Sequence, residues 1–361
     1  MSPPADVSFP QTALTADALA LLKRLIAQPS FSREEDRTAA LLAQFLEEKG
    51  IPFERLENNV WARNQHFDPT KPTILLNSHH DTVRPNPSWT LDPFTPLERD
   101  GKLFGLGSND AGGCLVALLA TFVHFHDRPD LSHNLVLVAS AEEEISGRNG
   151  LESVLPHLPP ISFAIVGEPT EMQLAIAEKG LLVLDCTAHG VSGHAARDEG
   201  DNAIYRAIQD INWLRTYPFP KVSPTLGPVK LSVTIINAGT QHNVVPDTCT
   251  FTVDVRVTDQ YTLDEILAVI RANVQSDVTP RSVRLKPSSI PLDHPIVQAG
   301  LALGRHTYGS PTTSDQAVLN CPSLKCGPGH SGRSHSADEF IYVRELADGI
   351  DGYIRMLERI L

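Results

Sequence analysis

The chain has 361 residues, of which 41% are hydrophobic and 20% are charged, with a formal net charge of −13. That length exceeds what one hydrophobic core usually supports, so two domains are expected, and the negative charge argues against nucleic acid or an anionic membrane as a partner. No stretch approaches the ~20 apolar residues of a membrane span, and residues 1–6 lack the basic start and apolar core of a signal peptide. Five scattered cysteines indicate reduced thiols, so we expect a cytoplasmic protein.

The first half of the chain alternates helices with buried strands. Apolar residues at helical spacing predict helices over residues 15–27 and 33–49. Short apolar runs predict strands over residues 74–78, 135–139 and 161–166, and an Ala- and Leu-rich stretch over 113–126 predicts a helix between the first two. Strands separated by helices indicate the α/β class, with a mainly parallel sheet and helices on both faces.

The pattern changes after about residue 177. Strands are predicted over residues 181–188, 230–237, 249–257 and 282–286, with helices over 202–215 and 263–274. Because residues 249–257 alternate between apolar and polar, that strand is expected to be buried on one face only. These elements indicate a smaller α+β domain with an antiparallel sheet and two helices.

The α/β character returns near residue 292, and a helix is predicted over residues 344–360. We therefore predict a large domain of residues 1–177 and 292–361, with residues 178–291 inserted into it.

Polar residues with metal-binding chemistry follow the predicted strands. His79-His80-Asp81 ends the first strand, where alternation places His79 and Asp81 on the same side of the chain. A Gly-rich loop around Asp110, the acidic triplet 142–144, Glu168 and the Gly- and His-rich loop 329–339 also follow or close elements of this sheet. Each segment alone could be a turn or a solvated patch. Together, their imidazoles and carboxylates suit a divalent metal, typically zinc.

These motifs resemble, in the same order, those of the di-zinc hydrolase family that contains aminoacylase, carboxypeptidase G, acetylornithine deacetylase and succinyl-diaminopimelate desuccinylase. The resemblance covers nearly the whole chain and includes the inserted domain. It implies a zinc-exopeptidase-like catalytic domain that hydrolyses an amide bond. It also implies two divalent metal ions, which we expect to be zinc, with cobalt or manganese as alternatives.

The resemblance also assigns roles to individual residues of the large domain. Glu143 is expected to be the general base, and Asp81 to fix the tautomer of His79. His80 matches no ligand of the family and is expected to be structural. The implied metal ligands are His79, Asp110 (bridging both ions), Glu144, Glu168 and His335.

Three residues of the inserted domain match further positions of the family. His194, in a Gly-x-x-Gly-His segment, is expected to reach the partner subunit's active site and steady the oxyanion, which implies a homodimer through the inserted domain. Asn243 matches a position near the substrate. Arg256 is expected to hold the substrate carboxylate, because its planar fork pairs with carboxylate through two hydrogen bonds. From the residues alone, His194 and Arg256 would be exposed polar residues.

The substrate is the least determined feature. Residues 76–83 and 178–180 are most similar to the acetylornithine deacetylase branch, which implies N-acetylornithine or N-acetylcitrulline as the small-molecule substrate, in arginine biosynthesis. N-succinyl substrates (succinylornithine or succinyl-diaminopimelate) come next, and would need a further cation such as Lys179, Arg197 or Arg333. A dipeptidase or aminopeptidase of the same family, and a non-catalytic binding protein that has kept the fold, are the remaining alternatives.

Overall fold

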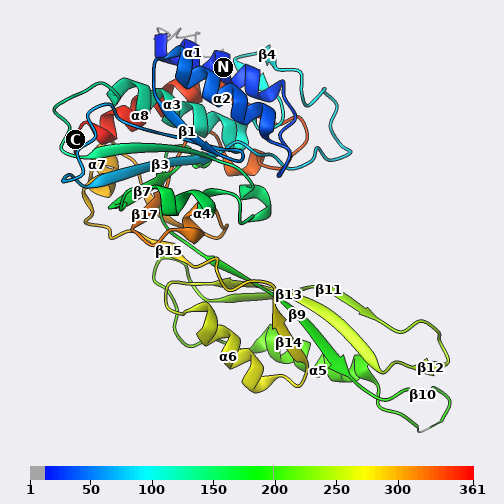
Figure 1. The fold of residues 1–361 in the computed structure, drawn as a ribbon. Coiled ribbons are helices and arrows are strands. Elements are labelled where there is room, and N and C mark those ends of the chain that lie inside the picture. The colour runs from blue at the N-terminus through cyan, green and yellow to red at the C-terminus, as the bar shows by residue number, and fades with distance from the viewer. Residues whose placement is uncertain (1–12, 198) are drawn as a thin grey trace, which may run out of the picture. The chain divides into compact units, whose positions relative to one another are not determined.

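The computed structural model describes residues 13–197 and 199–361, which divide into two compact units. The first unit contains the described residues up to Ile176, together with Ile290–Tyr308 and Ser314–Leu361. The second unit contains Ala177–Ser289 and Gly309–Thr313. The chain therefore leaves the first unit once for a long insertion and once for a short excursion (Figure 1).

The first unit is built on a sheet whose centre is parallel and whose margins are antiparallel. β6 pairs with β3, β3 with β7, and β7 with β17 in parallel, whereas the pairs β1–β2, β2–β6 and β17–β8 are antiparallel. This arrangement confirms the predicted α/β class. In order across the sheet, the strands are β1 (Phe53–Leu56), β2 (Asn59–Arg63), β6 (Asn134–Ser140), β3 (Thr73–His79), β7 (Phe163–Val166), β17 (Ser323–Lys325), β8 (Leu174–Glu178) and β15 (Ser288–Ser289), with β16 (Thr307–Ser310) also paired to β8. β15, together with the last two residues of β8 and of β16, belongs to the second unit.

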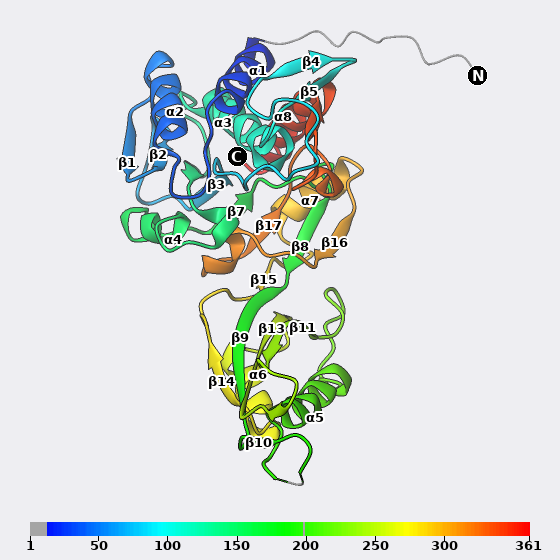
Figure 2. The ribbon, with the colours of Figure 1, turned by 90° about the vertical axis from the view of Figure 1, so that its right-hand side faces the viewer.

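Helices cover both faces of this sheet, as predicted. Ile74 and Leu76 of β3 pack with four helices on one face, whereas Leu75 packs with α4 on the other. Alternating strand side chains point to opposite faces, so one apolar strand serves both cores. Figures 1 and 2 show the four helices gathered on one side of the sheet and α4 on the other. The four are α1 (Ala13–Ile26), α2 (Asp36–Glu48), α3 (Gly113–Phe125) and α8 (Val343–Leu357); α4 is Leu151–Val154, and α7 (Pro295–Ala302) joins the larger core.

Three predicted element starts in the first unit differ from the structure by two or three residues, and the first is the helix expected from residue 15, which is already formed at Ala13. The helix expected from residue 33 begins at Asp36, because Arg33 has φ 76°, in the left-handed region, which a right-handed helix excludes. The strand expected from residue 161 begins at Phe163.

The second unit is an antiparallel sheet with helices on its apolar face. Its order is β11 (Lys230–Ala238), β13 (Thr248–Val257), β9 (Gly180–His189) and β14 (Asp277–Pro280). The apolar residues of β9 and β13 pack against α5 (Ala203–Thr216) and α6 (Leu263–Asn273). The predicted alternation is confirmed, since every second residue of β13 from Cys249 to Val257 is buried. Thr262 and Glu265 form a capping box that begins α6.

The strand predicted over residues 282–286 is wrong. The fourth strand of this sheet is β14, which pairs with residues 184–187 of β9. Val278 of β14 is buried, whereas Val283 is 45% exposed. The alternation of Val283 and Leu285 resembles a strand, but only Leu285 packs inward.

Two small sheets complete the described elements. β4 (Leu97–Arg99), β5 (Lys102–Phe104) and β18 (Phe340–Tyr342) form one, and β10 (Gly193–His194) pairs with β12 (Val244–Val245) in the other. Within the described residues, each helix is too short or too polar to cross a lipid bilayer.

Candidate metal centre and active site

The polar segments that follow β3, β6 and β7 lie side by side at one edge of the sheet. These three strands are parallel neighbours, and the register pairs His79 with Ser140, and Asn77 with Val166. The acidic triplet begins two residues after Ser140, and Glu168 comes two residues after Val166. The carboxyl ends of parallel strands are where α/β sheets bind ligands, so this edge holds the candidate site.

His79 lies at the centre of the site and is 1% exposed. Its Nε2 is 3.5 Å from Asp110 Oδ1, 3.8 Å from Glu143 Oε2 and 3.8 Å from Glu168 Oε1. Its Nδ1 is 3.0 Å from the backbone carbonyl oxygen of Asp81 and 3.5 Å from Asp81 Oδ1. A proton on Nδ1 can therefore be donated to the carbonyl, which leaves Nε2 free to face the three carboxylates.

Asp110 lies between two imidazoles. Its Oδ1 faces His79, and its Oδ2 is 3.6 Å from His335 Nε2. His335 Nε2 is also 3.0 Å from Glu144 Oε2. A carboxylate whose two oxygens face different ligand groups can bridge two cations. The structure thus brings all five predicted ligands and Glu143 into one cluster.

The donor set of this cluster fits two divalent cations. Two groups have ligand atoms within 4.8 Å of one another: His79 with Asp110 and Glu144, and His79 with Glu143 and Glu168. Carboxylates packed this closely repel one another, and a cation relieves that repulsion. Imidazole nitrogen and carboxylate oxygen are ligands for zinc, and also for cobalt or manganese.

The electrostatics of the cluster are strongly perturbed. Burial lowers the pKa of His79, but Glu143, Asp110 and Asp81 outweigh it and raise that pKa well above its usual range. Burial raises the pKa of Glu143 well above normal, against the opposing charge of His79. A hydrogen bond to Glu144 raises the pKa of His335 to about 9. Perturbed groups gathered in one place are typical of a functional site.

Asp81 also anchors the acidic triplet. Its Oδ1 accepts a hydrogen bond from Glu143 N at 3.0 Å, and its Oδ2 accepts from Glu144 N at 3.1 Å and from Ser32 Oγ at 2.6 Å. The role predicted for Asp81 concerned only the tautomer of His79. The carboxylate additionally fixes the backbone that carries Glu143 and Glu144.

His80 faces away from the cluster. Thr38 Oγ1 lies 2.9 Å from its Nδ1, and the carbonyl oxygen of Asn58 lies 2.8 Å from its Nε2. Burial lowers the pKa of His80 to about 4, so the ring is neutral at physiological pH. Its contacts join the end of β3 to α2 and to the turn between β1 and β2.

Two buried carboxylates beside the cluster were not predicted from the sequence. Asp315 accepts a hydrogen bond from Ser140 Oγ at 2.5 Å, and burial raises its pKa to about 6. Glu339 accepts from backbone N–H groups in the Asp110 loop, and burial raises its pKa to about 8. The only local signal for Asp315 was its place after Ser314, which caps a short turn. Glu339 lies within the Gly- and His-rich loop 329–339, but no role was predicted for it from the sequence.

The three residues predicted from the inserted domain lie in the second unit. His194 is on β10 and Asn243 immediately precedes β12, so the pairing of these strands brings the two residues together. Ala195 N donates to the Asn243 carbonyl oxygen at 3.0 Å, and His194 Nδ1 accepts from Ala196 N at 3.1 Å. His194 and Asn243 are both exposed.

The guanidinium of Arg256 is already partnered. Its Nε and Nη2 donate to the two carboxylate oxygens of Asp254 at 2.8 and 3.1 Å, and its Nη1 donates to Thr313 Oγ1 at 3.1 Å. A carboxylate that binds Arg256 must therefore share it with Asp254 or displace that carboxylate.

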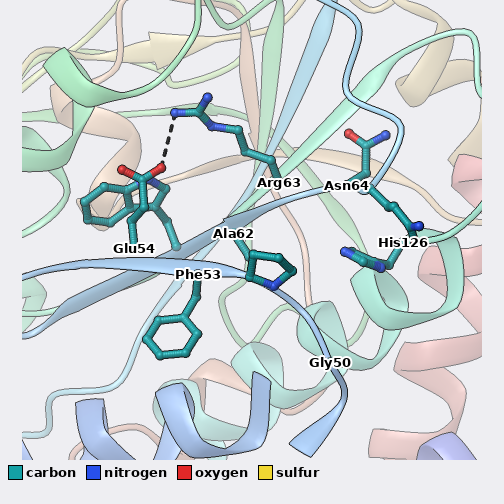
Figure 3. Close-up of a pocket in the computed structure, with 10 residues that line it drawn as sticks. Gly50, Phe53, Glu54, Ala62, Arg63, Asn64 and His126 are labelled. Atoms are coloured by element: carbon teal, nitrogen blue, oxygen red, sulfur yellow. Dashed lines mark hydrogen bonds and ion pairs between the residues drawn. The ribbon is translucent and has the colours of Figure 1, made fainter. Parts of the chain in front are cut away.

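A separate pocket of about 440 Å³ lies at the outer strands of the first unit (Figure 3). It is lined by β1, β2 and the end of α3, and includes an ion pair of Arg63 Nη2 with Glu54 Oε1 at 3.3 Å. His126 lies on its opposite side (Figure 3). Because its lining residues differ from those of the metal cluster, this pocket is distinct from the candidate active site.

Solved structures share the fold. The chain is similar to an M20 family metallo-carboxypeptidase from Sulfolobus solfataricus, with 16% identity over 95% of this chain and 99% of that chain, and a TM-score of 0.74. Aminopeptidase PepT from Bacillus cereus gives 16% identity, coverage of 96% and 98%, and a TM-score of 0.76. The Bacillus subtilis YXEP protein, described as a dinuclear metal binding peptidase from the M20 family, gives 17% identity, coverage of 96% and 98%, and a TM-score of 0.70.

The sequence itself matches a family model. The model described as peptidase family M20/M25/M40 matches residues 75–359, a stretch that contains every residue of the metal cluster. Because this match spans well over half of the chain, the protein is a hydrolase that belongs to peptidase family M20/M25/M40.

Proposed function

We propose that this hydrolase cleaves the amide bond of an N-acyl amino acid, with N-acetylornithine or N-acetylcitrulline, in arginine biosynthesis, as the first candidates. The observation that carries the proposal is the cluster in which Asp110 lies between the buried His79 and the exposed His335, with the Glu143 carboxylate beside it. The choice of substrate is supported by the similarity of residues 76–83 and 178–180 to the acetylornithine deacetylase branch. Five free cysteines support a cytoplasmic location.

The chain's own ligands divide between two cation positions. His79 and Glu168 would hold one cation, Glu144 and His335 would hold the other, and Asp110 would bind both. Divalent cations at these positions supply Lewis acidity, which makes water more acidic and an acyl carbonyl more electrophilic. We propose zinc as the native metal, with cobalt or manganese able to replace it.

Glu143 is the proposed general base. Its side chain lies inside the cluster, and its backbone is fixed by the hydrogen bond to Asp81. It takes a proton from the attacking water and then gives it to the leaving amine, so one carboxylate acts first as base and then as acid. The products are the free amino acid and the carboxylate of the acyl group. His194 is proposed to donate to the oxyanion, and Asn243 to contact the substrate.

Arg256 is proposed to bind the substrate carboxylate. Two further cationic side chains lie near it, since burial, Lys230 and Arg256 together lower the pKa of Lys179. Lys179 Nζ donates to the Pro228 carbonyl oxygen at 2.8 Å. This cationic surrounding favours N-succinyl amino acids as the second candidate substrates, since their acyl group carries an extra carboxylate.

A substrate panel tests the proposal. N-acetylornithine, N-acetylcitrulline, their N-succinyl counterparts and simple dipeptides are supplied to protein loaded with zinc, cobalt or manganese, and kcat/KM is compared. We expect the N-acetyl substrates to give the highest value. Higher values for dipeptides would favour the peptidase alternative, which the similar metallo-carboxypeptidase and aminopeptidase also suggest. A protein without turnover or stoichiometric metal would be the non-catalytic alternative.

We also propose a homodimer through the second unit. β11 is an edge strand of its sheet, and Ile235 and Ile236 on it are each 50% exposed. Tyr205 on α5 is 67% exposed. An exposed edge strand with apolar side chains is suited to pairing with another chain. Sedimentation analysis of the wild type and Ile236→Lys tests this: we expect a dimer that the substitution weakens, and a wild-type monomer with full activity would contradict it.

A further inference from the structure

A buried carboxylate outside the ligand set supports the loop that carries Asp110. Glu339 is 2% exposed. Its Oε1 accepts hydrogen bonds from Asn109 N at 2.8 Å and Asp110 N at 2.9 Å, and its Oε2 accepts from Gly107 N at 3.2 Å. One side chain therefore binds three backbone N–H groups within four consecutive residues.

These N–H groups need an acceptor from elsewhere in the chain. Asp110 lies in an irregular segment, Ser108–Gly112, in which Asp110 and Ala111 have non-helical backbone dihedrals, and Gly107 before it adopts a left-handed conformation with φ 75°. The N–H groups of such irregular backbone have no partner in a helix or a strand, and burial without a partner would be costly. A carboxyl group can accept all three hydrogen bonds, because its two oxygens together offer several lone pairs.

The position of Glu339 is itself fixed by backbone pairing. Gly105 N donates to the Glu339 carbonyl oxygen at 3.0 Å, and the following residue, Phe340, pairs with Phe104. The carboxylate thus projects from a strand pair against the loop that begins two residues beyond Gly105. The contact joins residues more than 200 positions apart in the sequence, with separations of 229 to 232.

The hydrogen bonds to Glu339 bear on the direction in which the Asp110 side chain points. Its oxygens lie 3.5 Å from His79 Nε2 and 3.6 Å from His335 Nε2. This intermediate position requires the backbone at Asp110 to be held in place. We propose that Glu339 is a positioning residue for the metal centre, which fixes the Asp110 backbone so that one carboxylate can serve both cation positions. The inference rests on the proposed two-metal function.

The acidic triplet is held in the same manner, which supports the inference. Asp81 accepts the N–H groups of Glu143 and Glu144, and Glu35 Oε1 accepts that of Glu142 at 3.2 Å. Both ligand-bearing loops are therefore fixed through main-chain N–H groups by buried carboxylates. Glu339 fixes the backbone of Asp110, the bridging ligand, as Asp81 fixes the backbone of Glu143 and Glu144.

The test is metal binding by Glu339→Gln. Glutamine has the same shape, but its amide nitrogen would face backbone N–H groups and lose at least one of the three hydrogen bonds. Metal-free protein is titrated with Co²⁺, followed by calorimetry and by the visible absorption of bound cobalt, with circular dichroism to establish folding. We expect affinity for the more weakly bound ion to fall by about 10- to 100-fold, as is usual when a group that orients a ligand is lost.

Asp338→Asn is the matched control. Asp338 Oδ1 accepts from Thr90 N and Leu91 N, both at 2.9 Å, so it makes the same kind of contact with a loop outside the metal cluster. Its cobalt affinity should equal that of the wild type. Glu339→Asp, which keeps the charge but shortens the side chain, should bind cobalt with intermediate affinity and serves as the test protein if Glu339→Gln does not fold.

Three results are distinguishable. Weaker second-ion binding by Glu339→Gln, with wild-type binding by Asp338→Asn, supports the inference. Two ions bound by folded Glu339→Gln or Glu339→Asp with wild-type affinity would overturn it and leave the proposed function standing. A wild-type protein that fails to bind two ions would overturn both.

Discussion

The two units hold their candidate functional residues in opposite ways. In the first unit, the like-charged carboxylates of Asp110 and Glu143 are packed together around His79, and the buried carboxylate of Asp81 fixes the backbone that carries Glu143. In the second unit, Arg256 is paired with Asp254, and His194 Nδ1 accepts a hydrogen bond from the backbone N–H of Ala196, two residues further along the chain. The first arrangement is incomplete without a cation or a proton, whereas the second is satisfied locally.

From this difference we expect the first unit to supply the reacting groups and the second unit to bind the substrate. Groups that are rigidly placed and mutually repelling are suited to binding metal and moving a proton. Groups that are exposed and satisfied can exchange their present partners for those of a substrate. We therefore expect substitutions in the first unit to lower kcat, and substitutions at Arg256 to raise KM. His194 is the case that tests the division, because it lies in the second unit but is proposed to act on the oxyanion.

The largest effect is expected from Glu143→Gln. Glutamine cannot accept the proton of water, so kcat should fall by about 10²- to 10⁴-fold, the usual contribution of general acid–base catalysis. Stoichiometric metal should remain bound. Steady-state kinetics together with metal analysis measure both quantities.

Glu142→Gln is the control for this substitution. Glu142 belongs to the same triplet, but its Oε1 accepts from Asn149 Nδ2 at 3.1 Å instead of facing the cluster. Its kcat should remain near that of the wild type. The assignment of Glu143 as the base fails if Glu143→Gln retains more than about a tenth of wild-type kcat.

The next largest effect is expected from His194→Asn. Loss of one oxyanion donor typically lowers kcat by about 10²- to 10³-fold. If His194 acts in the partner's site, mixing this variant with Glu143→Gln should restore activity. In the mixed dimer one site then has both an intact Glu143 and an intact His194 from the other subunit. A mixture no more active than its components would place His194 in its own subunit's site and remove one reason for a dimer.

The metal cluster could be predicted from sequence because its residues follow local signals. Apolar runs identified β3, β6 and β7, and parallel strands bring their carboxyl ends to one edge, so His79, Glu143 and Glu168 had to lie near one another. The resemblance to a known family then chose Glu143 within the acidic triplet and His335 within its loop, and it assigned each residue of the cluster its role.

The carboxylates that support the cluster could not be predicted in this way. Glu339 and Asp315 act through contacts with residues far away in the sequence, at separations of 230 for Asn109 and 175 for Ser140. A carboxylate that accepts backbone N–H groups has no motif of its own, because any segment can supply those groups. The strand expected over residues 282–286 failed for a related reason, since pairing with β9 is decided by tertiary register instead of local alternation.

A smaller effect, confined to substrate binding, is expected from Arg256→Lys. Lysine keeps the charge but loses the planar fork, so KM for a substrate carboxylate should rise by about 10- to 100-fold with little change in kcat. Arg281→Lys is the matched control, because Arg281 Nε and Nη2 bind the two oxygens of Asp185 at 2.8 and 2.9 Å in the same unit. Equal changes in KM for both variants would show that Arg256 only stabilises its sheet.

The smallest effect on turnover is expected from His80→Gln, which changes stability instead. Burial lowers the pKa of His80 from its ordinary value of 6.5 to about 4, so the unfolded chain takes up a proton that the folded chain excludes. The contribution of the neutral ring to stability is complete above pH 6.5 and is lost as the pH falls toward 4. His80→Gln should remove this acid sensitivity, and at neutral pH it should lower the free energy of unfolding by about 1–3 kcal/mol through its contacts with Thr38 and Asn58.

Urea unfolding of metal-free protein at several pH values measures both effects, and the metal is removed beforehand because acid also releases bound cations. Thr38→Val, which loses the hydroxyl but keeps the imidazole, should retain the acid sensitivity. An unchanged pH dependence of stability in His80→Gln would show that the buried ring does not control the acid sensitivity. A large loss of kcat would show that His80 takes part in catalysis.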